Sequence, residues 1–243
     1  MNLLIDIGNS LTKLALAEGQ KIIPMQILHD PAFSDFDHFL SQMDKPGNCI
    51  FSGSGEIIPG LHERLASSFR KVIQLTHHTP VPVKLQYETK ESLGMDRLAA
   101  AVGAHTLHPG QNCLVIDAGT AITIDLVTKD GFFMGGNISP GIRLRFLSLH
   151  EHTAKLPILE PEGDYSLLGS STEKAIRSGI LNGVKYELKG YIEELQKSYS
   201  PLQVILTGGD ASLLSKYFQP DIIIDLNLIF AGLNRILEYN ITR

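Results

Sequence analysis

The sequence has only two cysteines among its 243 residues. Two thiols cannot form the disulfide framework on which small secreted proteins depend, and a chain of this length can bury a sizeable core without a disulfide or a metal. Cys49 and Cys113 both lie in apolar, strand-like runs. We therefore expect two reduced thiols in the core of a cytoplasmic protein.

Basic residues are also scarce, with 21 Lys and Arg against 26 Asp and Glu, which gives a net charge of −5. General nucleic-acid binders need a basic face, so we expect no nucleic-acid partner. Runs of about 18 apolar residues, the length of a membrane helix, are missing, so we expect no membrane span. The N-terminal run MNLLIDIGNS has no basic residue before its apolar part and contains Asp6, which favours a first strand over a signal peptide.

An internal repeat is the most informative feature that is present. LLIDIGNSLTKLALA begins at Leu3, and LVIDAGTAITIDLVT begins at Leu114. An offset of 111 residues aligns Asp6 with Asp117, and it also aligns the glycines that follow two residues after each of them. Each copy is an apolar run, a glycine turn, a second apolar run, another turn and a third strand-like stretch, at 21–28 and at 132–138.

Helical and strand patterns alternate in the rest of each half. The clearest helix is predicted over 173–198, with Ser170 and Glu173 as a capping box. The pattern indicates two related α/β halves, 1–112 and 113–243, around a nucleotide cleft. Further helices are predicted at 61–69, 97–106 and 227–239 and from the spacing of Phe33, Phe36, Leu40 and Met43, and strands at 49–52, 71–75, 204–207 and 222–225.

The repeated turns have chemistry suited to a phosphate. A carboxylate such as Asp6 at the end of a buried strand can hold Mg²⁺, and Gly8 lets the backbone pass close to phosphate oxygens. Lys13 adds a cation to the same hairpin. An ordinary Asp-Gly turn explains one copy equally well, but two copies at matching positions favour phosphate loops. The sequence contains neither GxxxxGK[ST] nor a GxGxxG that opens a helix.

Three more segments are candidates. LTGGD at 206–210 and GGNISPG at 135–141 have glycines that could admit an adenine ring, a phosphate or a substrate, or that form plain turns. In GMDR at 94–97, Asp96 and Arg97 are either a base and an orienting cation or a weak surface ion pair. The two close histidine pairs, His77-His78 and His150-x-His152, lack a third ligand at zinc spacing.

Together these segments resemble the type III pantothenate kinases, which belong to the acetate and sugar kinase/Hsp70/actin superfamily. DxGN and DxGT are shared by the superfamily, whereas GMDR with GGNISPG narrows the resemblance to this family. The resemblance implies a duplicated ribonuclease H-like (actin-like ATPase) fold. The motifs that carry it are DIGNSLTK at 6–13, GMDR at 94–97, DAGTAIT at 117–123, GGNISPG at 135–141, GSST at 169–172 and LTGGD at 206–210.

The resemblance also implies roles for individual residues. Asp96 looks like the general base, Asp117 like a ligand of a monovalent cation, K⁺ or NH₄⁺, and Thr120 like a second phosphate contact. The family places a residue such as Thr172 across a dimer interface. The implied pantothenate contacts are Tyr87, Gly94, Met95, Asp96, Arg97 and Thr172. The implied ATP and Mg²⁺ loop comprises Asp6, Ile7, Gly8, Asn9, Ser10, Leu11, Thr12 and Lys13. The sequence departs from the family pattern at two of these positions taken together with the pantothenate contacts: Ser10 stands where Thr is common, and Met95 stands where a small residue is usual.

The implied activity is ATP-dependent phosphorylation of pantothenate to 4′-phosphopantothenate, the first step of coenzyme A biosynthesis, by a cytoplasmic homodimer. Two alternatives remain open at this point. One is another small-molecule kinase or a phosphohydrolase of the same superfamily. The other is a regulatory protein that binds nucleotide without turnover, although the presence of Asp6, Asp96, Arg97 and Asp117 argues against it.

Overall fold

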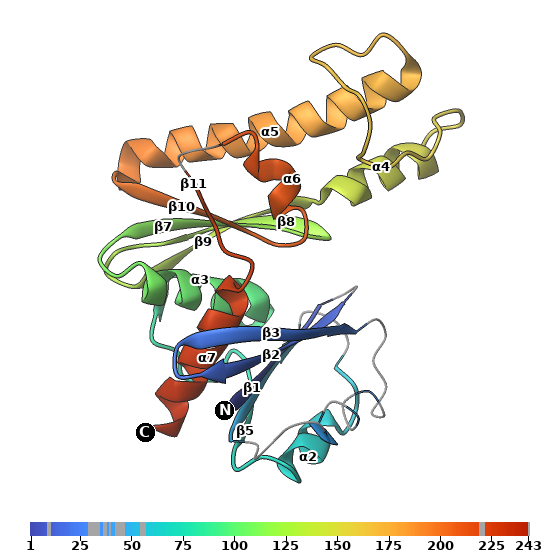
Figure 1. Ribbon diagram of the computed structural model, residues 1–243. Helices are drawn as coiled ribbons and strands as arrows, with labels where there is room; N and C mark the ends of the chain where they lie inside the picture. Colours follow the sequence, from blue (N-terminus) through green and yellow to red (C-terminus); the bar gives the residue numbers. More distant parts are fainter. Residues whose placement is uncertain are drawn as a thin grey trace. The chain divides into compact units, whose positions relative to one another are not determined.

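The computed structural model describes residues 1–8, 11–28, 35, 38, 40–41, 47–53, 57–218 and 222–242 (Figure 1). The chain forms two compact units. The first comprises Met1–Cys113, Leu126–Gly135 and Asn227–Arg243, and the second comprises Leu114–Asp125 and Gly136–Leu226. Among the described residues, no helix combines the length and the apolarity that crossing a membrane requires.

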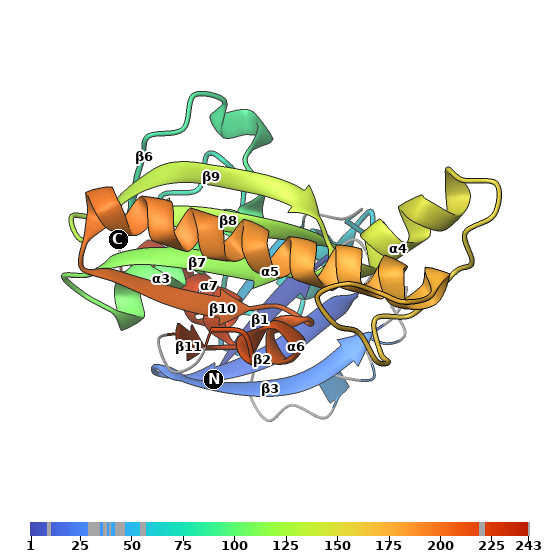
Figure 2. The same ribbon diagram turned by 90° about the horizontal axis from the view of Figure 1, so that it is seen from above.

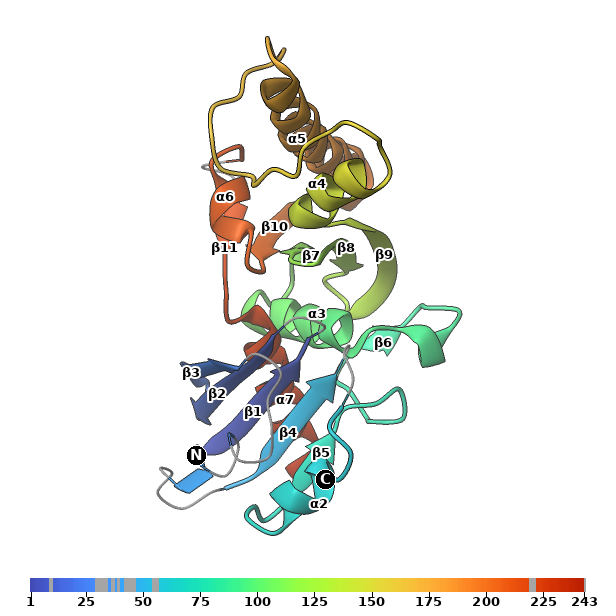
Figure 3. The same ribbon diagram turned by 90° about the vertical axis from the view of Figure 1, so that its right-hand side faces the viewer.

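The first unit is built on a five-stranded sheet with the order β3-β2-β1-β4-β5 (Figure 3). The first three strands are an antiparallel meander, whereas β4 pairs parallel to β1 and β5 parallel to β4. This is the strand–turn–strand–turn–strand unit that the sequence predicts, followed by two crossovers. The strands are β1 (Asn2–Ile7), β2 (Thr12–Glu18), β3 (Lys21–Leu28), β4 (Cys49–Gly53) and β5 (Val72–Gln74).

Alternation along β1 divides its side chains between two buried faces. Leu3, Ile5 and Ile7 share a core cluster with residues of α2 (Leu61–Ala66). Successive side chains of a strand point to opposite faces, so Leu4 and Asp6 point to the other face. That face is covered by α3 (Met95–Leu107), which contacts β4, and by α7 (Leu228–Ile241), which contacts β1 and β4.

The helices α3 and α7 pack very closely because glycines meet where they cross. A Cβ atom on Gly232 would lie 1.8 Å from the carbonyl oxygen of Ala99, and one on Gly103 would lie 2.3 Å from that of Leu228. Only glycine fits at these two positions. The sequence predicts the helix but not its partner, and this packing places α7 in the first unit although it follows the second unit along the chain.

A second, six-stranded sheet has the order β11-β10-β7-β8-β9-β6. Five of its strands, taken as β9-β8-β7-β10-β11, repeat the order of the first sheet, and β10 pairs parallel to β11 as β4 does to β5. The predicted duplication is thereby confirmed. β6 is an addition that pairs parallel to the start of β9. The strands are β6 (Lys84–Leu85), β7 (Asn112–Ala118), β8 (Ala121–Val127), β9 (Phe132–Pro140), β10 (Leu202–Thr207) and β11 (Ile222–Ile224).

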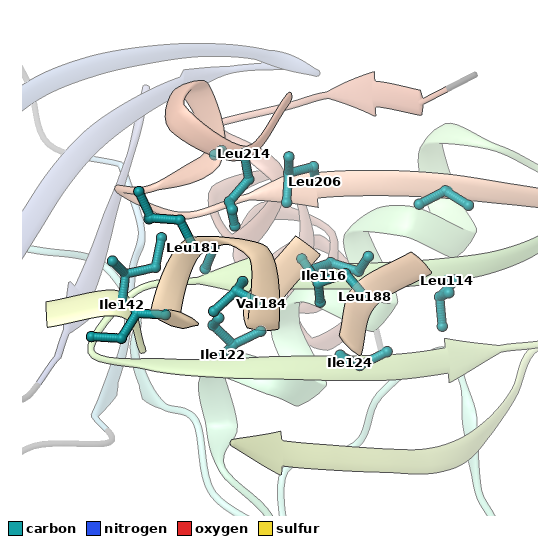
Figure 4. Packing of buried hydrophobic residues seen from close by; sticks show 14 of the residues in the cluster. Leu114, Ile116, Ile122, Ile124, Ile142, Leu181, Val184, Leu188, Leu206 and Leu214 are labelled. Carbon is teal, nitrogen blue, oxygen red and sulfur yellow. The ribbon is translucent and has the colours of Figure 1, made fainter. Parts of the chain in front are cut away.

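The core of the second unit lies between its strands and α5 (Thr172–Tyr199), a 28-residue helix that runs across the sheet in Figure 2. Val184 and Leu188 of α5 pack among strand residues such as Ile116 and Ile122 (Figure 4). The helix predicted from the sequence is confirmed, and its apolar residues form one stripe: Ile176, Ile180, Val184 and Leu188 are buried, and Ile192 and Leu195 pack against the same cluster. α4 (Ile142–Glu151) and α6 (Ala211–Ser215) complete the unit.

Most predicted elements are found within a few residues of their expected bounds. The helix cap lies one residue later than predicted, since Ser171, and not Ser170, is the N-cap, and its hydroxyl accepts from the Lys174 amide at 3.3 Å. α4 was not predicted, because its sequence has no clear apolar stripe. The helix expected from Phe33, Phe36, Leu40 and Met43 rests mainly on positions outside the described residues. Residues 1–112 and 113–243 as the two halves remain a prediction.

Candidate functional site

The first glycine turn joins β1 to β2. The Gly8 amide donates to the Leu11 carbonyl at 2.9 Å, and Asp6 and Lys13 pair across the two strands. A Cβ atom on Gly8 would lie 3.1 Å from the Leu11 oxygen, which makes the turn tight enough to favour glycine. Thr12 is buried at the start of β2. Asn9 and Ser10 of the predicted loop lie outside the described residues.

The Asp6 carboxylate is held in a buried, polar setting. Its side chain is 8% exposed, and the Ser52 hydroxyl of β4 donates to Oδ1 at 3.2 Å. Burial raises the pKa of Asp6 to about 6, against the opposing effect of Lys13; the negative charge of Asp96 raises it further, and the Ser52 hydrogen bond lowers it. A carboxylate that is costly to ionise in its site is well suited to take up a cation.

Asp96 lies in the first turn of α3, on the sheet face to which Asp6 points. Its Oδ1 accepts from the Arg97 amide at 2.7 Å. A Cβ atom on Gly94, the N-cap, would lie only 2.5 Å from this oxygen, so glycine leaves room for the carboxylate. Since the charge of Asp96 acts on the pKa of Asp6, the first unit brings the predicted base and the predicted phosphate-loop carboxylate into one electrostatic environment.

Arg97 is stacked on aromatic rings. It is 5% exposed, and its guanidinium carbon lies 5.5 Å from the Tyr87 ring centroid and 6.0 Å from that of Phe133. Nη1 of Arg97 also donates to the Tyr87 hydroxyl at 3.4 Å. Gly135, with φ +94°, lies against Tyr87, whose Cδ2 would be 3.3 Å from an added Cβ. The predicted pair Tyr87 and Arg97 is therefore brought together. Met95 is also buried.

The second glycine turn, between β7 and β8, belongs to the second unit and is surrounded by two other glycine segments. A Cβ atom on Gly208 (φ +92°) would lie 2.4 Å from Asp117 Oδ1. A Cβ atom on Gly141 would lie 2.4 Å from the Thr120 carbonyl oxygen, and the Gly141 amide donates to that oxygen at 3.0 Å. The Asp210 amide donates to the Ala118 carbonyl oxygen at 2.9 Å. Three motifs noted separately in the sequence thus converge on one turn.

Asp210 adds a second half-buried carboxyl group to this convergence. Burial raises its pKa, Glu162 acts in the same direction, and the cation of Arg143 opposes them. Thr172 lies elsewhere in the second unit, exposed at the first residue of α5.

Two residues of the site were missed from the sequence. Ser52 ends the predicted strand at 49–52, so a parallel pairing with β1 would have pointed to it. Phe133 carries no sequence signal beyond its apolar character, and its place beneath Arg97 emerges only from the packing. The assignment of roles to individual site residues remains a prediction.

Two sheets of the same strand order, each with an acidic glycine turn after its first strand, define the duplicated ribonuclease H-like, or actin-like ATPase, fold. A candidate N-acetylmannosamine kinase from Listeria monocytogenes has this likeness at a TM-score of 0.59, with 12% identity over 98% of this chain and 99% of that chain. A candidate Baf family transcriptional activator from Campylobacter jejuni reaches a TM-score of 0.67, with 25% identity over 99% of this chain and 100% of that chain.

Comparison with known sequences establishes the family. The family model of type III pantothenate kinases matches residues 2–194. A type III pantothenate kinase from Phocaeicola vulgatus is 42% identical over 248 residues, which cover 99% of each chain. The chain belongs to the type III pantothenate kinase family, and the resemblance drawn from its motifs is confirmed.

Proposed function

We propose that this protein transfers the terminal phosphoryl group of ATP to the primary hydroxyl of pantothenate, giving 4′-phosphopantothenate, as the first step of coenzyme A biosynthesis. Family membership supports the kinase activity. The observation that carries the proposal is that, within the first unit, the buried carboxylate of Asp6 points to the sheet face covered by α3, whose first turn carries Asp96, and that the charge of Asp96 raises the pKa of Asp6.

Positioning of the reactants and neutralisation of the phosphate charge account for most of the rate enhancement in enzymatic phosphoryl transfer. Asp6, Lys13 and the backbone around Gly8 would hold the phosphates and a divalent cation, and Thr120 would contact the phosphates from the second turn. The Asp6 carboxylate fits such an ion, because it is buried and a cation beside it would stabilise its charged form. When bound, the ion supplies charge neutralisation. Within the described part of the chain no three acidic, His or Cys side chains gather as ligands, which fits a cation held largely by phosphate oxygens.

Asp96 would accept the hydroxyl proton of pantothenate. Its Oδ1 is oriented by the Arg97 amide, which leaves Oδ2 for the substrate. The guanidinium of Arg97, stacked against Tyr87 and Phe133, would anchor the pantothenate carboxylate. Gly94 and Met95 would line the same site.

The finer family properties extend the proposal. Asp117 would bind a monovalent cation, K⁺ or NH₄⁺, and the Gly208 backbone that packs against its carboxylate supports a fixed position for it. Thr172 would contact pantothenate across the interface of a homodimer, and the exposure of Thr172 leaves it open to such a contact. The enzyme would act in the cytoplasm.

The test is a coupled assay of ADP release with pantothenate, with and without potassium. We expect pantothenate-dependent turnover that increases with potassium. A lack of pantothenate-dependent ADP release under both conditions would overturn the proposal. Simple sugars, acetate and water as acceptors would reveal another kinase or a phosphohydrolase of the superfamily.

A regulatory protein is the second candidate, because one structural relative is a candidate transcriptional activator. Such a protein would bind nucleotide and release no ADP in response to pantothenate. Equilibrium binding of a fluorescent ADP analogue beside the turnover assay separates the two candidates.

A further inference from the structure

One arginine links three elements at the end of β9. Nε of Arg145, in α4, donates to the Pro140 carbonyl at 2.8 Å, and Nη2 donates to the Ser139 hydroxyl at 3.2 Å. Nη2 also donates to Oε2 of Glu187, in α5, at 2.5 Å. The end of the strand is therefore fixed to the long helix through a single guanidinium.

The segment held in this way supports the second glycine turn. Gly141, directly after Pro140, donates its amide to the Thr120 carbonyl at 3.0 Å, and its α-carbon is so close that an added Cβ would lie 2.2 Å from the Gly119 oxygen. At such short range a small shift of Gly141 must move the turn. The contacts thus run without a gap from Glu187 through Arg145 and Pro140 to Thr120.

The pair of Arg145 and Glu187 differs from the other ion pairs of α5. Its side chains are 21% and 23% exposed, whereas each of the other ion pairs of α5 among the described residues has at least one side chain that is 61% exposed or more. Exposed pairs contribute little, but charge-assisted hydrogen bonds in a half-buried setting are stronger. A lysine cannot replace the planar fork that reaches three acceptors at once.

We propose that Arg145, held by Glu187, is a positioning residue for the nucleotide: it fixes Pro140 and Gly141 so that Thr120 lies where it meets a phosphate. The proposal rests on the proposed function, in which Thr120 is a phosphate contact. Neither Arg145 nor Glu187 needs to touch the substrates.

The experiment compares Arg145→Met, Arg145→Lys, Glu187→Gln and the double variant Arg145→Met/Glu187→Gln with the native protein. Lys189→Gln is the control, since it removes an exposed pair from the same helix. Four quantities are measured: kcat, KM for ATP, KM for pantothenate, and the dissociation constant of a fluorescent ADP analogue, beside the melting temperature.

We expect Arg145→Met to raise KM for ATP and the ADP-analogue dissociation constant about tenfold, with KM for pantothenate within twofold of native, and Arg145→Lys to keep most of this loss. The double variant should be no worse than Arg145→Met, because both changes break one network. Lys189→Gln should match the native protein. If Arg145→Met does not fold, Arg145→Lys and Glu187→Gln give the same selective effect.

Native nucleotide affinity in the Arg145 variants would overturn the proposal, as would equal losses for both substrates accompanied by a lower melting temperature. Additive effects of the two changes would remove Glu187 from the network. If the native protein binds the analogue but does not phosphorylate pantothenate, the proposed function fails, whereas the binding constants still decide the role of Arg145. A native protein that binds no nucleotide would overturn both.

Discussion

The burial of the Asp6 carboxylate, for which we propose a role in holding phosphate and a divalent cation, has a cost in stability. Its pKa of about 6 lies above the ordinary 3.8, because burial disfavours the ion. The unfolded chain therefore gives up this proton more easily than the folded one. Folding stability from this group is full at low pH and is lost as the pH rises from about 4 through 6.

Asp6→Asn should therefore stabilise the protein at pH 8 in the absence of nucleotide and divalent cations. The gain is at most about 3 kcal/mol, at 1.36 kcal/mol for each pKa unit, and it should vanish near pH 4. Urea unfolding of both proteins across this pH range measures the difference. The same difference at every pH would contradict the raised pKa.

Asp96→Asn tests the proton acceptor. The amide keeps the shape of the side chain but cannot take up a proton, and general-base assistance is worth about 10²–10⁴-fold in rate. We expect kcat to fall by that range while the ADP analogue binds as before. Turnover above half of the native value would exclude Asp96 as the base.

Gly208 and Gly209 are adjacent in the chain, but only Gly209 has room for an added Cβ atom. An added Cβ on Gly208 would collide with Asp117 and Ala118 in a left-handed backbone, whereas nothing lies within 4 Å of one on Gly209. Gly208→Ala should lose about 1–3 kcal/mol of unfolding free energy, and Gly209→Ala should lose little. Thermal unfolding of the two variants measures this difference in stability. Equal stability would mean that the turn adapts to the extra atom.

At the scale of elements, the crossing of α3 and α7 is the tightest helix contact among the described residues with glycines at its centre. Gly232→Ala would place a Cβ 1.8 Å from the Ala99 oxygen, so the helices must separate, at about 1–3 kcal/mol. Gly190 offers a matched control in α5, since it is exposed and nothing lies within 4 Å of an added Cβ.

Gly190→Ala should stabilise the protein by about 0.5–1 kcal/mol, because alanine loses less backbone entropy in a helix. The two glycine variants should thus move the unfolding midpoint in opposite directions in chemical denaturation. A stabilising Gly232→Ala would show that the helices accommodate a wider crossing.

Elements with a strong local pattern could be predicted from the sequence. Alternating apolar runs and Asp-Gly turns predict the two meanders, and the stripe from Ile176 to Leu195 predicts α5. β6 and α4 could not be predicted, because β6 has two residues and α4 has no clear stripe. Their structure depends on neighbours distant in the sequence.

The candidate site also divides into residues that have a sequence signal and residues that do not. Asp6, Asp96, Arg97 and Asp117 stand in recognisable motifs, so they could be predicted as site candidates. Ser52 and Phe133 could not be, because each joins the site through a contact that only the folded chain creates, and the same holds for Arg145, for which we propose a positioning role.

At the scale of the whole molecule, α7 ties the end of the described chain to the first unit. A variant that ends at Leu226 lacks α7 and exposes the apolar face of α3. We expect it to lose cooperative unfolding and to aggregate, as measured by circular dichroism and light scattering. Cooperative melting of the shortened chain would show that α7 is dispensable for the first unit.

The return of α7 also has a consequence for synthesis on the ribosome. The first unit takes its closing helix from Asn227–Arg243, whereas the second unit is complete once Leu226 has been made. Domains usually fold in the order in which they are translated. Here we expect the reverse order: the part of the N-terminal sheet and of α3 that α7 covers stays exposed until translation has passed the second unit, and this interval is when a chaperone would have the most surface to bind.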